Sequence, residues 1–146
     1  MTQLFVLFTW VLFGFVGLAF LESTVEGELG GGEGTKGWRK NILGYRLKEY
    51  HFWLWYAVVP IFVFSPLVAT GPDPRVFGTL AVAYLVGGIL EDFLYFVVNP
   101  NFGLRKWNSR YGKWMPWFKM GRVEVPQFYV RNALAAGIVW IFFVWL

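Results

Sequence analysis

Four long apolar runs alternate with two polar stretches and one short turn along the chain. The apolar runs cover residues 4–21, 52–69, 76–98 and 128–146. Each is close to the roughly 20 residues that an α-helix needs to cross the hydrocarbon core of a bilayer. The first run lacks a basic leader and a small-x-small cleavage pattern, so we expect it to be retained as a membrane helix. The pattern therefore predicts an all-α membrane protein with four transmembrane helices.

The two polar stretches, 22–50 and 101–126, carry signs of helices lying in the membrane interface. In the first, Trp38, Ile42 and Tyr45 stand among basic residues. In the second, aromatic and basic residues each recur at helical spacing, which is typical of an interfacial amphipathic helix. These residues are Trp107, Tyr111, Trp114 and Phe118 on one face and Lys106, Arg110 and Lys113 on another. We therefore expect one or two interfacial helices in these connectors.

The glycine run at residues 30–32 is the most unusual segment of the first connector. A glycine-rich segment can cradle phosphate groups, but GGGEGTKG fits neither the spacing of a P-loop nor that of a dinucleotide fingerprint. It also does not follow a predicted strand. We interpret it as a flexible or tightly turned connector.

Composition supports a membrane protein and excludes several classes of site. Only 15% of the 146 residues are charged and 57% are hydrophobic, whereas soluble domains average about 25% charged residues. The absence of cysteine excludes disulfides, thiolate metal sites and thiol nucleophiles. The single histidine argues against membrane oxidases that use many histidine ligands. We expect one domain, residues 1–146, formed by a four-helix bundle.

The basic residues predict the orientation in the membrane. Both polar stretches are rich in lysine and arginine, whereas the turn between the second and third runs holds only Arg75. By the positive-inside rule, both stretches face the cytoplasm and both termini lie outside. We therefore expect a multi-pass protein of a prokaryotic inner membrane, and we attribute the net charge of +4 to topology rather than to nucleic-acid binding.

Polar side chains gather at the predicted cytoplasmic ends of the spans. Among them, Glu91 and Asp92 lie about seven residues before the end of the third run, so roughly 10 Å below the interface. A charge at that depth is costly and usually faces the interior with a partner. The polar residues at these ends are Glu22, Glu49, His51, Glu91, Asp92, Tyr95, Asn99, Arg131 and Asn132.

Two interpretations of Glu91 and Asp92 stay open. One acid pairs with Arg131 as a structural ion pair, or the polar residues form a functional pocket in which Glu91 or Asp92 acts as an acid. Because adjacent helical residues point about 100° apart, we expect the two acids to have different environments. In the pocket, Tyr95, Asn99, Arg131 and Asn132 are the expected binding residues.

His51 is a candidate metal ligand as well as a candidate packing residue. As a ligand it would need Glu49, Glu91 or Asp92 beside it. Such a site would combine nitrogen and oxygen donors. The sequence itself requires no cofactor and allows a divalent metal.

The acidic segment at residues 90–100, LEDFLYFVVNP, resembles the acidic helix of the small membrane lycopene cyclases. In that family a Glu-Glu pair precedes aromatic residues and a proline, and the resemblance implies a carboxylic acid that protonates a polyene. This chain has Asp at the second acidic position. A wider set of short motifs resembles a family of small uncharacterised prokaryotic integral membrane proteins, which implies the architecture and no activity. These motifs are Gly37-Trp38, Tyr50-His51, Glu91-Asp92 and the segment 99–103.

Three functions fit these features. The first is a small membrane protein that binds an ion or an amphiphilic ligand in the cytoplasmic leaflet, or that acts as an accessory subunit. The second is a membrane enzyme that uses an intramembrane carboxylic acid on a lipid or isoprenoid substrate. The third is a small channel or transporter, which would require self-association. The expected partners are membrane lipids, with a homo-oligomer or a membrane complex as further options.

Overall fold

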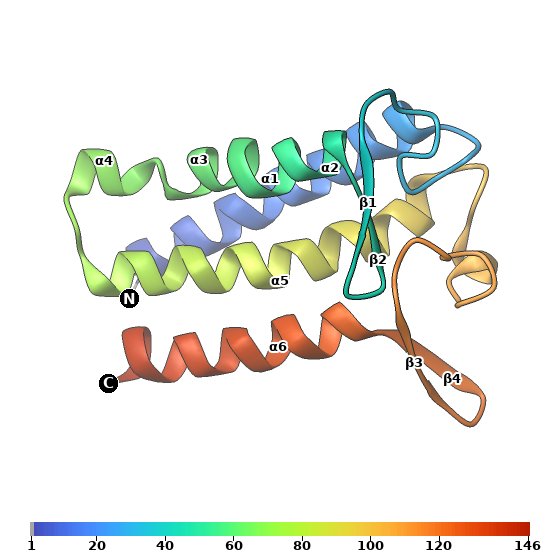
Figure 1. Ribbon diagram of the computed structural model, residues 1–146. Helices are drawn as coiled ribbons and strands as arrows, with labels where there is room; N and C mark the ends of the chain where they lie inside the picture. Colours follow the sequence, from blue (N-terminus) through green and yellow to red (C-terminus); the bar gives the residue numbers. More distant parts are fainter. Residues whose placement is uncertain (1) are drawn as a thin grey trace.

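The computed structural model describes residues 2–146 and contains four helices long and apolar enough to span a membrane (Figure 1). The first is α1 (Thr2–Glu26), and the third is α5 (Pro74–Val98). The second, Glu49–Thr70, consists of α2 (Glu49–Trp53), η1 (Leu54–Val58), α3 (Val59–Phe64) and α4 (Pro66–Thr70). The fourth is α6 (Gln127–Val139) continued by η3 (Trp140–Trp145). The four spans predicted from the apolar runs are therefore present as helices.

The second span is irregular around its two prolines. Proline lacks a backbone N–H, so a helix that contains it loses one hydrogen bond and deforms nearby. Directly before Pro60 the helix widens into the π-turn η1, in which the N–H of Val59 bonds to the carbonyl of Leu54. At Pro66 a new helical segment, α4, begins after Ser65. The irregularity next to Pro60 is therefore a change of helical pitch.

Each connector contains a β-hairpin, so the prediction of interfacial helices there was wrong. In the first, β1 (Arg39–Ile42) pairs antiparallel with β2 (Tyr45–Lys48). In the second, β3 (Trp117–Met120) pairs antiparallel with β4 (Val123–Pro126). The only helical turn between α5 and β3 is the short η2 (Leu104–Lys106). The turn residues of the connectors, rather than the helical spacing of their aromatic residues, therefore indicate the structure that forms.

The turn residues explain why hairpins form. Leu43 and Gly44, between β1 and β2, both have positive φ angles, 50° and 83°. Two successive positive φ angles are typical of the tight turn that matches the twist of a two-stranded ribbon. Gly121, between β3 and β4, has a φ of 62°. These loops fold the chain back within two residues, which a helix does not allow.

The helix α5 is central to the arrangement of the spans. In Figure 1 it lies between α6 and the pair formed by α1 and the second span. Phe15 of α1 lies directly over Gly87, where an added Cβ would approach the phenyl ring to 2.1 Å. The shared core of α1, the second span and α5 includes Phe15, Val63 and Leu80. On the other side, Gly78 of α5 lies against Phe143 of η3.

The outward faces of the helices are strongly apolar. Trp10 is 75% exposed, and many other large apolar side chains of the four spans are also exposed. Water would solvate such a surface poorly, whereas lipid tails would solvate it well. Examples are Phe5, Phe13, Ile61, Phe62, Leu134 and Phe142. This surface agrees with a multi-pass membrane protein.

Candidate functional site

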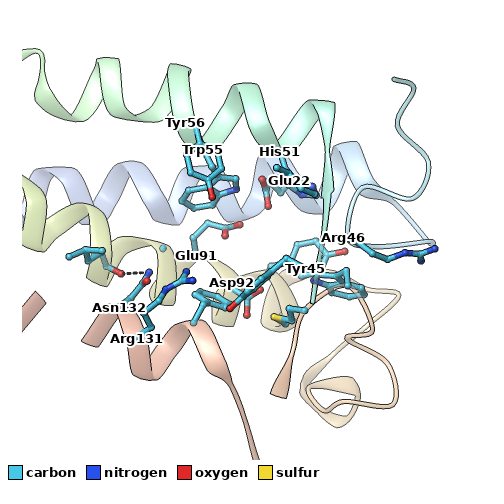
Figure 2. Close-up of a pocket in the computed structure, with 18 of the residues that line it drawn as sticks. Glu22, Tyr45, Arg46, His51, Trp55, Tyr56, Glu91, Asp92, Arg131 and Asn132 are labelled. Carbon is cyan, nitrogen blue, oxygen red and sulfur yellow. Dashed lines mark hydrogen bonds between the residues drawn. The ribbon is translucent and has the colours of Figure 1, made fainter. Parts of the chain in front are cut away.

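A cavity of about 420 Å³ lies at one end of the helices, where both hairpins are found. At this end α1 and α5 finish and the second span and α6 begin, and we call it the hairpin end (Figure 1). All four spans and β2 contribute to the cavity wall. Figure 2 shows the polar side chains that line it. The predicted clustering of polar residues at one end of the spans thus coincides with a cavity.

One wall of the cavity carries two glutamates and the histidine. Glu22 and Glu26 are four residues apart on α1 and therefore share one helix face. His51 lies opposite on α2, and its Nε2 is 2.8 Å from Oε1 of Glu26. One ligand atom from each of the three side chains lies within 4.8 Å of the others. We call this group the Glu22–Glu26–His51 cluster.

Glu91 of α5 lies beside this cluster and is almost completely buried. It is 3% exposed, and Glu22 is 5% exposed. One carboxyl oxygen of each, Oε1, has no hydrogen-bond partner within residues 2–146, and neither does the buried hydroxyl of Tyr95. Buried polar groups without partners are uncommon because they cost free energy. The cavity therefore offers several polar atoms to a molecule that enters it.

Asp92 has a different environment from Glu91, as their 100° offset on the helix predicts. Its Oδ2 accepts a 2.8 Å hydrogen bond from the hydroxyl of Tyr129 on α6. This bond joins α5 to α6 and gives one oxygen of the Asp92 carboxyl a donor. Glu91 and Asp92 are both cavity residues, and the fully buried oxygen without a partner belongs to Glu91.

Arg131 does not form the ion pair considered for it. None of the salt bridges among the described residues involves Arg131. Its guanidinium carbon instead lies 5.6 Å from the centre of the Tyr45 ring, a cation–π contact between α6 and β2. The rotation of α6 presents Tyr129, rather than Arg131, to Asp92.

The other two predicted binding residues of the polar ends have structural hydrogen bonds. Asn132 lies in the cavity wall, where its amide donates to the carbonyl of Leu85 on α5 at 3.3 Å. Asn99 is buried at the end of α5, and its amide donates to the carbonyl of Gly27 at 3.4 Å. Asn99 does not line the cavity, whereas Tyr95 does.

The carboxylate beside His51 is that of Glu26, not that of Glu49. Glu49 points away, and its Oε2 accepts the backbone N–H of Trp38 at 3.2 Å. Sequence reasoning missed Glu26 because the apolar run stops at residue 21, whereas α1 continues to Glu26. The four-residue spacing of Glu22 and Glu26 is the signal that could have indicated it.

The glycine run 30–32 packs closely over the cluster. All three glycines have positive φ angles. A Cβ added to Gly32 would lie 2.8 Å from Cε1 of His51, and one added to Gly30 would lie 2.3 Å from the ring of Phe102. Only glycine allows this backbone to approach the two rings so closely. The run is thus a tight turn rather than a flexible linker.

Lys48 holds the glycine run in place. Its side chain is 2% exposed, and its ammonium group donates to the carbonyl of Gly31 and lies 2.9 Å from Oε1 of Glu33. The hydrogen bond from Lys48 lowers the pKa of Glu33. Burial lowers the pKa of Lys48, against the opposing effect of the Glu33 carboxylate. The ion pair therefore fixes the turn that lies against His51.

Comparison of the chain with protein-family models, curated proteins and solved structures finds no match in any of the three. The resemblance of residues 90–100 to the lycopene cyclases and the resemblance to small prokaryotic membrane proteins therefore stay predictions.

Proposed function

We propose that this chain is an integral membrane protein that binds an amphiphilic ligand in the cavity at the hairpin end. The observation that carries the proposal is a cavity of about 420 Å³ that combines a buried wall of carboxyl groups and one histidine with many aromatic and aliphatic side chains. Arg46, Arg131 and Asn132 add further polar groups to its lining. Ligand pockets typically combine a mostly apolar lining with a few polar groups that fix orientation. The polar end of the ligand would face the Glu22–Glu26–His51 cluster and Glu91.

The position of the cavity supports access from the bilayer. Its wall includes Tyr56, which is 67% exposed on the second span, and the exposed Arg131 on α6. The two spans lie on either side of α5 (Figure 2), and each contributes an exposed side chain to the cavity wall. With both basic connectors in the cytoplasm, the hairpin end lies in the cytoplasmic leaflet of a prokaryotic inner membrane. Apolar tails would enter sideways, while the head group stays near the interface.

Native mass spectrometry of the purified protein, with identification of bound lipids, tests the proposal. Gly88 lines the cavity. A Cβ added to Gly88 would lie 3.6 Å or more from the side chains of Trp55 and Asn132. Gly88→Leu should fill part of the cavity and remove the bound amphiphile. Gly17→Leu is the matched control, since Gly17 lies on α1 with nothing within 4 Å.

Two results in these spectra would contradict the proposed binding of an amphiphile. Wild-type protein without a bound amphiphile, or equal occupancy in both variants, would refute binding in this cavity. The same spectra report the number of chains per particle and so test the homo-oligomer required by a channel. A protein that travels with the chain would support the accessory-subunit alternative.

A second candidate function is an enzyme that acts on a lipid or isoprenoid. It is favoured by Glu91, a buried carboxyl with one unpartnered oxygen beside a cavity large enough for part of such a molecule. A general acid must reach the substrate directly, and Glu91 meets that geometric requirement. Incubation with a lipid extract, followed by mass spectrometry, should show a product that Glu91→Gln does not form although it still binds the amphiphile. Equal conversion by the variant would exclude Glu91 as the acid.

A further inference from the structure

The geometry points to a site for one divalent transition-metal ion formed by Glu22, Glu26 and His51. This inference goes beyond amphiphile binding, because the metal site would exist whether or not the cavity holds a lipid. The site uses Glu26 instead of Glu49, which the sequence suggested as the partner of His51. Oε2 of Glu49 accepts a hydrogen bond from the backbone N–H of Trp38. The three residues come from α1 and α2, two helices that meet at the hairpin end.

The distances among the three side chains suit a single ion. Their ligand atoms lie within 4.8 Å of one another, and the His51–Glu26 pair is already at 2.8 Å. Metal–ligand distances of about 2 Å allow one ion to join atoms up to about 4 Å apart. Small rotations of the carboxylate groups would therefore complete the set. An ion would replace the proton that His51 and Glu26 now share in their hydrogen bond.

Unsatisfied buried groups give independent support. Oε1 of Glu22 and Oε1 of Glu91 are buried without hydrogen-bond partners in the described chain, although both line the cavity at the cluster. The nearby cation Lys48 is bound to Glu33 and to the carbonyl of Gly31. Two buried glutamates thus face one histidine, and a divalent ion would balance the charges of the two carboxylates when both are ionised.

The donor set indicates the class of metal. Two carboxylates and one imidazole give mixed oxygen and nitrogen ligation, which suits Zn²⁺, Mn²⁺ or Fe²⁺. Mg²⁺ and Ca²⁺ prefer oxygen ligands alone. Three protein ligands would also leave a coordination position open, as in catalytic metal sites.

The open position would be directed toward the cavity. Figure 2 shows Glu91 close to Glu22 on the cavity side, with Trp55 across from it. This step rests on the proposed function: an oxygen of the amphiphile head group would occupy the open position, and Glu91 would accept or donate a hydrogen bond there. The metal site itself does not depend on that step.

Metal content tests the inference directly. The full chain is purified with a tag that contains no histidine, treated with a chelator, and titrated with Zn²⁺ alone in lipid nanodiscs. Wild-type protein should bind one Zn²⁺ per chain, and Mg²⁺ in excess should not compete. Glu26→Gln and His51→Gln should each weaken Zn²⁺ binding more than about tenfold. Glu49→Gln, the matched control, should bind as wild type.

X-ray absorption on Zn²⁺-loaded wild-type protein keeps the test valid if the variants fail to fold. His51 is the only histidine, so imidazole scattering from the ion can come from no other residue. Its presence supports the site. Less than stoichiometric Zn²⁺, a spectrum without imidazole, or equal loss in Glu49→Gln and folded Glu26→Gln would overturn the inference. Bound lipid is measured separately by native mass spectrometry. A failure of Zn²⁺ binding would therefore not refute the proposal that the cavity binds an amphiphile.

Discussion

The hydroxyl of Tyr129 donates a 2.8 Å hydrogen bond to Oδ2 of Asp92. The two residues are 37 positions apart, and they connect α6 to α5 at the hairpin end. Both acids line the cavity, but the bond holds Asp92 toward α6, whereas Glu91 lies beside the Glu22–Glu26–His51 cluster. Asp92, about 100° around the helix from Glu91, thus contributes to the site through its hydrogen bond with Tyr129.

Removal of the Tyr129 hydroxyl should destabilise the protein modestly. Tyr129→Phe leaves Oδ2 of Asp92 without its donor, and interhelical hydrogen bonds in membranes contribute about 1 kcal/mol. We expect a loss of about 1 kcal/mol in the free energy of unfolding, measured by denaturation in mixed micelles. Tyr56→Phe is the control, since Tyr56 is exposed on the second span. An equal effect in both variants would show that the Tyr129–Asp92 bond is not the cause.

The Glu33–Lys48 ion pair should give the first connector an acid-sensitive contribution to stability. Because the hydrogen bond from Lys48 lowers the pKa of Glu33 in the folded protein, the ionised form is favoured by folding. The stabilisation is complete above the ordinary glutamate pKa and is lost as the pH falls through the lowered folded value. Glu33→Gln should therefore be less stable than wild type at pH 7, and the difference should disappear in strongly acidic solution.

Thermal unfolding of wild type and Glu33→Gln at several pH values measures this effect. Glu28→Gln provides the matched control, because Glu28 is an exposed glutamate in the same connector. A difference between wild type and Glu33→Gln that stays constant down to the most acidic pH would contradict the role of the ion pair.

The orientation can be tested with single cysteines, since the native chain contains none. Lys36→Cys lies in the first basic connector, and Arg75→Cys lies at the start of α5 at the opposite end of the spans. We expect a membrane-impermeant maleimide added to intact cells to label Arg75→Cys and to label Lys36→Cys only after the membrane is opened. The reverse pattern would place both termini in the cytoplasm and the cavity in the outer leaflet.

The architecture of the spans could be predicted because the length of an apolar run is a property of the local sequence. The hairpins could not, because Trp107, Tyr111, Trp114 and Phe118 are spaced as on a helix by coincidence. In the structure, Trp114 and Phe118 belong to different segments, and Trp114 stacks on Phe96 with ring centroids 5.9 Å apart. The turn residues Gly44 and Gly121 carried the correct signal. Local turn chemistry thus prevailed over aromatic periodicity.

The sequence could predict only those site residues whose ionisable side chains lie within or next to an apolar span. Glu91, Asp92 and His51 were indicated because ionisable groups inside apolar spans need partners. Which partners they have depends on helix rotation and on where helices end, and neither follows from composition. Arg131 therefore lies over Tyr45 instead of beside an acid. Glu26 was missed because α1 extends beyond its apolar run.

The close approach of the glycine run to His51 gives a prediction about the site that changes no ligand. In Gly32→Ala the new methyl group would lie 2.8 Å from Cε1 of His51, on a backbone with a φ of 66° that disfavours alanine. Either the imidazole or the turn must then shift, which disturbs the 2.8 Å approach of His51 to Glu26, so Zn²⁺ affinity should fall about tenfold or more. Calorimetric titration with Zn²⁺ in nanodiscs measures the change.

Two controls separate the contact with His51 from backbone strain. Gly121→Ala introduces the same kind of strain, at a φ of 62°, in a turn with no atom within 4 Å. Gly34→Ala places a methyl group in the same connector as Gly32, at ordinary distance from Leu29. Both should keep the Zn²⁺ affinity of wild type, because neither displaces the imidazole. If Gly121→Ala weakens Zn²⁺ binding as much as Gly32→Ala, general destabilisation accounts for the loss, and the glycine run does not position His51.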